Sequence, residues 1–497
     1  MDYIVAFDQG TTSSRCVIFD REAKMVSMAQ EEIHRYFPRP GWVEQDAMEI
    51  WSSQIGMYTK ALMKAHLVAQ DIEAIGITNQ RETTIIWDKR TGKPVCRAPV
   101  WQCRRGAPLI DKLVAAGHTD MIRTKTGLVP DAYFSASKIR WILDNIEGAR
   151  KDAEAGHLLF GTVDSWLMWK MTEGAVHVTD YTNASRTMLF NIHTLAWDSE
   201  LLDLFDIPAS LLPEVRSSLD IFGATVGGSG SQIPICGVLG DQQAALLGQC
   251  CFDSGQAKAT YGTGCFVLMN TGDKAVISDH GLLSTIAFSW QDDNAEKPSV
   301  TYALEGSIYN AGSVIKWLRD ELHMIRTEEE TEELVRSVSD NAGVYFVPAF
   351  NGIGAPYWNS NARGLITGLT QGATRAHIVR AALESVGFRV YDILQAMAED
   401  AQMPFSELRV DGGVSRNNAA MQFQSDLLGT EVIRPQVIET TALGVAFAAG
   451  LGSGFWDSPT ELRKLIKIDR TFTPSRDAEE MRSLKAGWDH AIKQVQV

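Results

Sequence analysis

The sequence predicts an α/β protein built from two similar halves, with a ligand cleft between them. Short apolar runs typical of strands alternate with helical stretches along the chain, as they do in α/β proteins. A unit of apolar run, polar turn and second apolar run occurs at residues 3–19 and again at residues 257–269. Because 497 residues exceed what one hydrophobic core usually serves, we expect domains at 1–246 and 247–497, with a ligand bound between them.

Hydrophobic periodicity and turn residues divide each half into individual elements. In the first half we expect strands at 3–7, 16–19, 25–29, 72–78, 84–87 and 234–239, and helices at 44–64 and 244–248. In the second half we expect strands at 257–261, 265–269 and 407–410, and helices at 379–397 and 417–428. Val379, Val386 and Val390 belong to an apolar stripe with helical spacing, and Asp46 is a candidate cap for the first helix.

Composition and charge indicate a folded cytoplasmic protein. Hydrophobic residues make up 45% and charged residues 22%, and the net charge of −15 disfavours nucleic acid and anionic lipid as partners. The 7 cysteines, an odd number without a CxxC pair, indicate reduced thiols and no zinc site. With neither a signal peptide nor an apolar run of membrane-spanning length, we expect a cytoplasmic location, no nucleic-acid partner and no stable membrane insertion.

The polar turn at residues 8–15, with the sequence DQGTTSSR, is a candidate phosphate site. Gly10 lets the backbone come close to a ligand, the hydroxyls and backbone N–H groups suit phosphate oxygens, and Arg15 adds a cation. Asp8 is placed to hold Mg²⁺ through water. A plain polar hairpin turn has the same composition, so the turn alone leaves both interpretations open.

Two further glycine turns make the phosphate interpretation more specific. The GTG turn at 262–264 again joins two predicted strands, and the DGG turn at 411–413 leaves a strand and enters a helix. Turns of this kind tolerate the close approach of a nucleotide. No Walker-type GxxxxGK[ST] segment occurs in the chain to supply a rival site.

Asp241 and the Arg81–Glu82 pair are the candidate groups for chemistry. Asp241 follows a predicted strand and a glycine, so it suits either a helix N-cap or a general base that accepts the proton of an attacking hydroxyl. Arg81 and Glu82 pair a donor with an acceptor that can grip a vicinal diol, or else they form an exposed ion pair in a turn. The residues alone leave both alternatives open.

Three aromatic residues are candidates for the wall of a small polyol site. Trp101 and Phe266 can pack on a carbon skeleton, although aromatic side chains more often simply fill the core. Tyr133 lies in the segment PDAYF and offers a phenol hydroxyl from a partly buried ring.

Several of these segments closely resemble the glycerol kinases of the FGGY carbohydrate kinase family. The resemblance rests on residues 8–15, 76–84, 101–105, 240–243, 261–265 and 411–413, and it covers nearly the whole chain. It implies two ribonuclease-H-like domains of the actin-like ATPase type that close on Mg-ATP and glycerol. The implied reaction is in-line transfer from ATP to glycerol, with Asp241 as general base and sn-glycerol 3-phosphate and ADP as products.

The resemblance also implies a role for individual residues of this sequence. Glycerol would be bound by Thr11, Arg81, Glu82, Trp101, Tyr133, Asp241, Gln242 and Phe266. The nucleotide and its phosphates would be bound by Thr11, Thr12, Ser13, Arg15, Thr263, Gly312, Lys316, Gly413 and Asn417, with Mg²⁺ held through water by Asp8. Because relatives assemble as dimers or tetramers, a homodimer or homotetramer is expected.

The sequence differs from the family at positions expected to affect nucleotide preference and regulation of the activity. Lys316 stands where many relatives place a glutamine near the adenine. Gln232 replaces an arginine in the loop 227–232, which resembles the sugar-bisphosphate inhibitor site of some bacterial members, so we expect weak or absent inhibition by fructose 1,6-bisphosphate. The stretch 217–232 also lacks the histidine whose phosphorylation activates other members.

Two alternative functions share part of this evidence. A pentulose or tetritol kinase would belong to the same wider family, but the Arg81–Glu82 block argues against it. An actin-like or chaperone-like ATPase would share the three glycine turns without needing a polyol pocket. Release of ADP with and without glycerol separates a transferase from such an ATPase.

Overall fold

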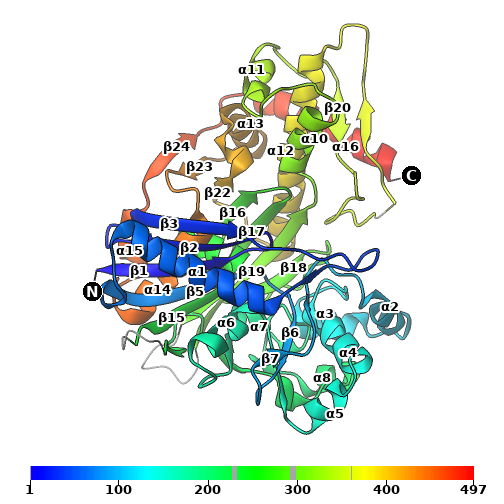
Figure 1. Ribbon diagram of the computed structural model, residues 1–497. Helices are drawn as coiled ribbons and strands as arrows, with labels where there is room; N and C mark the ends of the chain where they lie inside the picture. Colours follow the sequence, from blue (N-terminus) through cyan, green and yellow to red (C-terminus); the bar gives the residue numbers. More distant parts are fainter. Residues whose placement is uncertain (1, 227–231, 291–297, 360, 497) are drawn as a thin grey trace.

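The computed structural model describes residues 2–226, 232–290, 298–359 and 361–496. Two large sheets, one from each half of the chain, form the centre of the molecule, and helices cover their faces (Figure 1). Most of the predicted regulatory loop, residues 227–231, lies outside the described residues, whereas Gln232 is described and exposed.

The sheet of the first half has the strand order β14-β15-β5-β1-β2-β3. Its strands are β1 (Tyr3–Gln9), β2 (Ser13–Phe19), β3 (Met25–Glu32), β5 (Ile72–Asn79), β14 (Gly223–Ala224) and β15 (Pro234–Gly240). Strand β1 is antiparallel to β2 and parallel to β5, and β5 is parallel to β15. The carboxyl ends of β1, β5 and β15 therefore meet at one edge of the sheet, where the candidate residues follow.

The sheet of the second half repeats this arrangement in the order β18-β19-β17-β16-β22-β23-β24. Its strands are β16 (Gln256–Tyr261), β17 (Cys265–Gly272), β18 (Leu283–Trp290), β19 (Ser299–Ile308), β22 (Glu407–Gly412), β23 (Val432–Pro435) and β24 (Ile468–Phe472). Strand β16 is antiparallel to β17 and parallel to β22, which is parallel to β23. The predicted repeat of the N-terminal hairpin is confirmed.

The predicted helices are confirmed, with ends that their caps explain. Helix α1 (Ala47–Ala65) packs on β2 and β3 and begins after Asp46, whose side chain accepts from two backbone N–H groups. Helix α12 (Arg375–Ala401) contains the predicted apolar stripe and lies against β17 and β19. Helix α13 (Asn418–Leu428) packs on α12 and is capped by Asn417. Each of these helices is predicted from an Asp or Asn at its N-terminus or from an apolar face with helical spacing.

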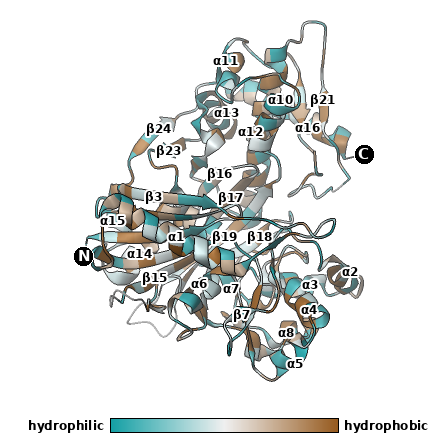
Figure 2. Cartoon of the chain, viewed as in Figure 1, coloured by the Kyte–Doolittle hydropathy of each residue, from teal (hydrophilic) through white to brown (hydrophobic). Residues whose placement is uncertain are grey.

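Helix α14 (Thr440–Ser453) crosses between the two halves. It comes late in the chain, yet it packs on β1, β5 and β15 of the first sheet and on α9 (Asp241–Gly248). The glycines permit this contact, because a Cβ on Gly76 or Gly237 would collide with the α14 backbone. The hydrophobic core around α14 contains buried apolar residues of both halves and so joins them (Figure 2). The expected domain boundary at residue 246 falls inside α9.

A lobe inserted in the first half carries several candidate residues (Figure 1, blue through cyan to green). Its elements include β6 (Ile85–Asp88), α2 (Ala107–Ala115), α3 (Thr119–Thr126), α4 (Ser135–Asn145), α5 (Ala149–Glu154), β9 (Leu158–Gly161), α6 (Val163–Met171), α7 (Tyr181–Ala184) and α8 (Ser199–Phe205). Strand β6 pairs with β9 within the lobe. Its side chains Ile85 and Trp87 share a hydrophobic cluster with strand β5 of the first sheet, which holds the lobe beside that sheet. Across the described residues, we find no helix with the length and apolarity that crossing a membrane requires.

Candidate active site

The Arg81–Glu82 turn joins β5 to β6 and lies inside the protein. Arg81 is 3% exposed and Glu82 is 1% exposed, so the alternative of an exposed surface ion pair is wrong. Glu82 has a φ of +61°, a left-handed conformation that costs a non-glycine residue free energy and is concentrated at functional sites. The hydroxyl of Ser135, at the start of α4, donates to the Glu82 carbonyl and helps to hold this conformation.

Arg81 is held by carboxylates from both halves of the chain. Its two terminal nitrogens donate to Glu305 on β19, at 2.5 and 3.0 Å, in the bidentate geometry that guanidinium and carboxylate favour. Its Nε lies 3.2 Å from Oδ1 of Asp241. Gly240 makes room for this arrangement, because a Cβ there would lie 2.7 Å from the Arg81 Cδ.

Glu82 is held mainly by Arg186, in the segment after α7. Nε of Arg186 donates to Oε1 of Glu82 at 2.7 Å, and Nη2 donates to Oε1 of Glu305 at 3.1 Å. Burial raises the pKa of Glu82 above its ordinary value, although both arginines oppose the shift. Burial would raise the pKa of Glu305 as well, but there Arg186 and Arg81 outweigh it and lower the pKa to about 2.

Asp241 is the first residue of α9 and the most accessible acid of this group. The N-cap is Gly240, so the alternative role of Asp241 as N-cap is wrong. Its side chain is 30% exposed, against 1% for Glu305. The contacts from Arg81 Nε and from the Gln242 N–H, at 2.8 Å, both involve Oδ1, which leaves Oδ2 to face a ligand.

Trp101 and Tyr133 lie together at the wall of this site. Their rings are 5.3 Å apart, and Nε1 of Trp101 donates to the Thr11 hydroxyl at 2.9 Å. Burial raises the pKa of Tyr133, so its phenol stays protonated and can donate a hydrogen bond. Buried Lys138 on α4 fixes the Tyr133 segment by donating to the carbonyls of residues 132, 133 and 134.

One face of the second sheet turns toward these residues. Because side chains alternate along strands and Glu305 is registered opposite Leu268, Phe266 and Lys258 share the face that bears Glu305. Lys258 is buried and donates to the side-chain oxygen of Gln242 at 2.6 Å. Burial lowers the pKa of Lys258. Phe266 is half-buried on β17 and packs against the core between the halves.

The first glycine turn is tighter than the sequence suggested. Strands β1 and β2 extend to Gln9 and from Ser13, so Asp8 and Arg15 lie directly opposite each other on the two strands instead of within the turn. Arg15 lies 3.7 Å from Asp8 and makes a closer contact with Glu439, just before α14. Burial, with Glu439 and Asp241 nearby, raises the pKa of Asp8 to about 6, against the opposing effect of Arg15.

The second and third turns adjoin the start of α10 (Gly312–Asp320). The carbonyl of Thr263 accepts from the N–H groups of Ala311 and Ser313, each at 3.0 Å. Gly312 must be small, because a Cβ there would lie 2.6 Å from the Gly262 oxygen. Asp411, buried at the end of β22, accepts from the Thr440 hydroxyl at the start of α14. The Glu439–Thr440 corner thus links Arg15 of the first turn to Asp411 of the third.

A pocket of about 190 Å³ opens beside the third turn. Its lining residues are Ile315, Glu328, Glu329, Thr331, Glu332, Leu383, Gly413, Val414, Arg416 and Asn417. A Cβ on Gly413 would meet nothing within 4 Å, so this glycine borders open space. Asn417 donates from its side chain to Thr331 of α11 (Glu330–Arg336) at 2.9 Å. Lys316 is exposed on α10 and is not part of this lining.

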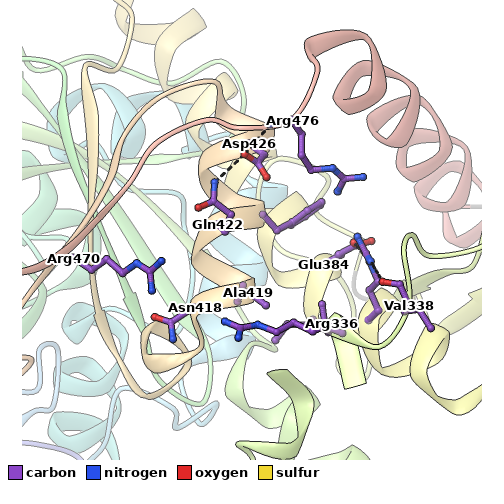
Figure 3. A pocket seen from close by; sticks show the side chains of 14 residues that line it. Arg336, Val338, Glu384, Asn418, Ala419, Gln422, Asp426, Arg470 and Arg476 are labelled. Atoms are coloured by element: carbon purple, nitrogen blue, oxygen red, sulfur yellow. Dashed lines mark hydrogen bonds and ion pairs between the residues drawn. The ribbon is translucent and has the colours of Figure 1, made fainter. Parts of the chain in front are cut away.

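A second pocket, of about 330 Å³, is lined by residues of α11, α12 and α13 (Figure 3). It shares Leu383 with the first pocket but contains no residue that the sequence predicted to be functional. Three of its arginines are already paired with acids: Arg336 with Glu332, Arg380 with Glu384, and Arg476 with Glu480. With its arginines paired in this way, the pocket is an ordinary polar packing region between α11, α12 and α13.

The described residues contain no cluster of three or more His, Cys, Asp or Glu side chains able to hold a metal ion. Asp8 nevertheless has two more carboxylates near enough to raise its pKa, those of Glu439 and Asp241, and Arg15 is the cation that lowers it. Such a region accepts a hydrated Mg²⁺ that arrives with phosphate oxygens as its other ligands. The residues therefore fit the expected ion when it is held through water.

Sequence reasoning missed Glu305, Arg186, Lys258 and Glu439. Glu305 and Lys258 carried a usable signal, because a charge inside an otherwise apolar strand is rarely buried without a partner. Arg186 and Glu439 lie in irregular segments beside helices and carried no such signal. Their roles depend on which distant segments meet.

Family comparisons agree with this architecture. The N-terminal domain of the FGGY family of carbohydrate kinases matches residues 3–248, and the C-terminal domain of that family matches residues 257–453. The chain belongs to the FGGY family of carbohydrate kinases. The first matched range holds the whole first sheet, and the second holds the strands β17 to β23 of the second sheet and all but the first residue of β16, but not β24. Helix α14 belongs to the C-terminal range and packs on the N-terminal sheet.

Individual FGGY relatives are similar over nearly their full length. A glycerol kinase of Shewanella frigidimarina is 57% identical over 493 residues, covering 99% of this chain and 98% of the relative. Glycerol kinase 1 of Clostridium tetani is 56% identical over 492 residues, with the same coverage of both chains. The crystal structure of Plasmodium falciparum glycerol kinase with ADP superposes with a TM-score of 0.94 at 37% identity, covering 100% of this chain and 99% of that one.

Proposed function

We propose that the protein transfers the γ-phosphoryl group of ATP to glycerol, giving sn-glycerol 3-phosphate and ADP. The observation that carries this proposal is the group formed by buried Arg81, Glu82 and the more accessible Asp241, with Arg81 Nε 3.2 Å from the Asp241 carboxylate. A donor, an acceptor and a base within one small site suit a polyol that must be held by its hydroxyls. The full-length glycerol kinase relatives support this choice within the FGGY family.

Glycerol lies between the Arg81–Glu82 turn and the aromatic wall in this proposal. Its hydroxyls hydrogen-bond Arg81, Glu82, Tyr133 and Gln242, and its carbons pack on Trp101 and Phe266. Asp241 accepts the proton of the hydroxyl that attacks the γ-phosphorus, which raises the nucleophilicity of that oxygen in the transition state. The orienting contacts supply the larger share of the rate enhancement, because in-line phosphoryl transfer depends mainly on positioning and charge.

The nucleotide is proposed to run from the first glycine turn to the 190 Å³ pocket. Phosphate oxygens accept from Thr11, Thr12, Ser13, Arg15 and Thr263. Gly312, Gly413, Asn417 and Lys316 lie along the sugar and base. Asp8 would hold Mg²⁺ through water, and the bound ion would neutralise charge on the phosphates.

Several broader properties belong to the same proposal. The two domains divide at about residue 246 in this proposal. The protein is cytoplasmic and assembles as a homodimer or homotetramer, because these properties go with the family. The net charge of −15 supports the absence of a nucleic-acid partner.

A coupled assay of ADP release tests the function. We expect ADP formation to depend on glycerol, with kcat/KM on glycerol exceeding that on erythritol and xylulose by roughly 100-fold or more, as expected when buried polar groups are left unpaired by the wrong substrate. A preference for xylulose or erythritol would favour the other carbohydrate kinases. ATP turnover that is unchanged by glycerol would instead favour an actin-like ATPase.

A further inference from the structure

The groups proposed to hold glycerol belong to one continuous chain of buried ion pairs. Glu82 is bonded to Arg186, Arg186 to Glu305, and Glu305 to Arg81. Arg81 then reaches Asp241 through Nε. Charges alternate along this chain, so each side chain is oriented by a neighbour of opposite sign.

Glu305 is the member of this chain that comes from the other half of the protein. It lies on β19 of the second sheet, registered opposite Leu268 and Leu283, whereas Arg81, Glu82 and Arg186 precede residue 240. Gln243 adds a second link, since it accepts from Arg81 and donates to Thr285 on β18. The Arg81–Glu82 turn is thus completed by the second sheet.

The choice of Arg81 nitrogens that bond to Glu305 indicates what Glu305 does. Both terminal nitrogens of Arg81 are taken by Glu305, so only Nε points to Asp241. Without that carboxylate, the Arg81 fork would be free to turn onto Asp241, which is the nearest remaining accessible acid. Arg186 likewise engages Oε1 of Glu82 and leaves Oε2 for a ligand hydroxyl.

Stability alone does not account for this arrangement. Placing two carboxylates and two guanidiniums in a dry interior carries a large desolvation cost, and apolar replacements of such groups are often neutral or stabilising. Nη1 of Arg186 is also buried and, among the described residues, has no hydrogen-bond partner. A cluster that retains an unsatisfied donor is better explained by orientation of a functional site than by packing.

We propose that Glu305 and Arg186 are positioning residues that set the orientation of Arg81 and Glu82 for the polyol, so that the site is complete only when the second sheet supplies Glu305. This inference rests on the proposed glycerol kinase activity. It assigns neither residue a contact with the substrate. Their effect is exerted through the hydrogen bonds to Arg81 and Glu82.

The variant Glu305→Gln tests the proposal, because glutamine keeps the shape but loses the charge and one acceptor. We expect KM for glycerol to rise about 10- to 100-fold, the size of a lost charge-assisted hydrogen bond, while KM for ATP changes less than about threefold. The stabilisation of the folded protein by ADP in thermal unfolding should persist, and the stabilisation by glycerol should be lost. Glu305→Asp, which keeps the charge, should recover part of the glycerol affinity.

Glu384→Gln is the matched control. Glu384 is also a buried carboxylate of the second half, paired with Arg380 at 2.7 Å, but it lines the pocket of Figure 3 and not the polyol site. Both variants should lower the melting temperature, because each leaves a buried arginine without its carboxylate. Only Glu305→Gln should change KM for glycerol by more than about twofold.

The possible results separate the two proposals. If the native protein releases no glycerol-dependent ADP, the proposed function fails. If the native protein is active and a folded Glu305→Gln variant binds glycerol normally, or if Glu384→Gln raises KM for glycerol equally, the positioning role is rejected. Should Glu305→Gln not fold, Arg186→Lys carries the same test, since the single ammonium of lysine does not reproduce the two separate donors, Nε and Nη2, that Arg186 directs at Glu82 and Glu305. A normal KM for glycerol in that variant rejects the role, and a selective rise supports it.

Discussion

The indole Nε1 of Trp101 donates a hydrogen bond of 2.9 Å to the hydroxyl of Thr11. This bond joins the wall of the proposed polyol site to the first glycine turn, the proposed phosphate site, so one contact links the two proposed sites. We expect Trp101→Phe to raise KM for glycerol and for ATP together, each about 2- to 10-fold, the size of one lost hydrogen bond. Steady-state kinetics with both substrates measures this.

Trp197→Phe is the control for that variant. Its Nε1 also donates a hydrogen bond, to the carbonyl of Pro213 at 2.8 Å, but within the lobe of the first half. Unchanged KM values are expected for Trp197→Phe. A Trp101→Phe variant that affects only one substrate would contradict the link between the two sides of the site.

Replacement of Asp241 by asparagine tests the general base. Asparagine keeps the shape and can still accept hydrogen bonds, but it does not take up the proton. We expect kcat to fall about 10²- to 10⁴-fold, the usual contribution of a positioned acid or base, with glycerol binding largely kept. Near-normal turnover in Asp241→Asn would reject the assignment.

The pKa of Asp8 predicts how nucleotide use depends on pH. Burial favours the neutral acid and raises the pKa of Asp8 to about 6, so the carboxylate becomes protonated as the pH falls through 6. Because a neutral acid attracts hydrated Mg²⁺ poorly, kcat/KM for Mg-ATP should decline below that pH. Asp8→Asn should have a low value throughout and lose this acid limb. A limb that persists unchanged in Asp8→Asn would assign the titration to another group.

Gly240 is predicted to be required by the close approach of Arg81. A Cβ at this position would lie 2.7 Å from Arg81 Cδ and 2.9 Å from the Gln243 side-chain oxygen, so alanine must displace the guanidinium. We expect Gly240→Ala to lower kcat/KM for glycerol about 10- to 100-fold, as small misplacements near reacting groups do. Gly56→Ala, in helix α1 with nothing within 4 Å of the added methyl, should leave activity unchanged and raise stability by up to ~1 kcal/mol.

Gln232 underlies a prediction about regulation. We expect the native protein to be inhibited weakly or not at all by fructose 1,6-bisphosphate, and Gln232→Arg to strengthen inhibition about 10-fold or more through a charge-assisted phosphate contact. Titration of the sugar bisphosphate at saturating substrates measures this. Strong inhibition of the native protein at sub-millimolar effector would overturn the prediction.

Much of the fold could be predicted because its signals are local. The two hairpins, the capped helix α1 and the apolar stripe of α12 each follow from neighbouring residues and a fixed period. Helix α14 shows the limit of that approach, because its position on the first sheet depends on where distant glycines permit close packing.

The sequence by itself determined the α/β class and the repeated hairpin, and it named the candidate residues of the proposed site, because these depend on local pattern and on recognisable motifs. The tertiary structure decided how those residues are held. Trp101 meets Thr11 across 90 residues, and Arg81 meets Glu305 across 224. No local pattern fixes such a pairing, since it arises only when two sheets dock and a buried charge must find its partner.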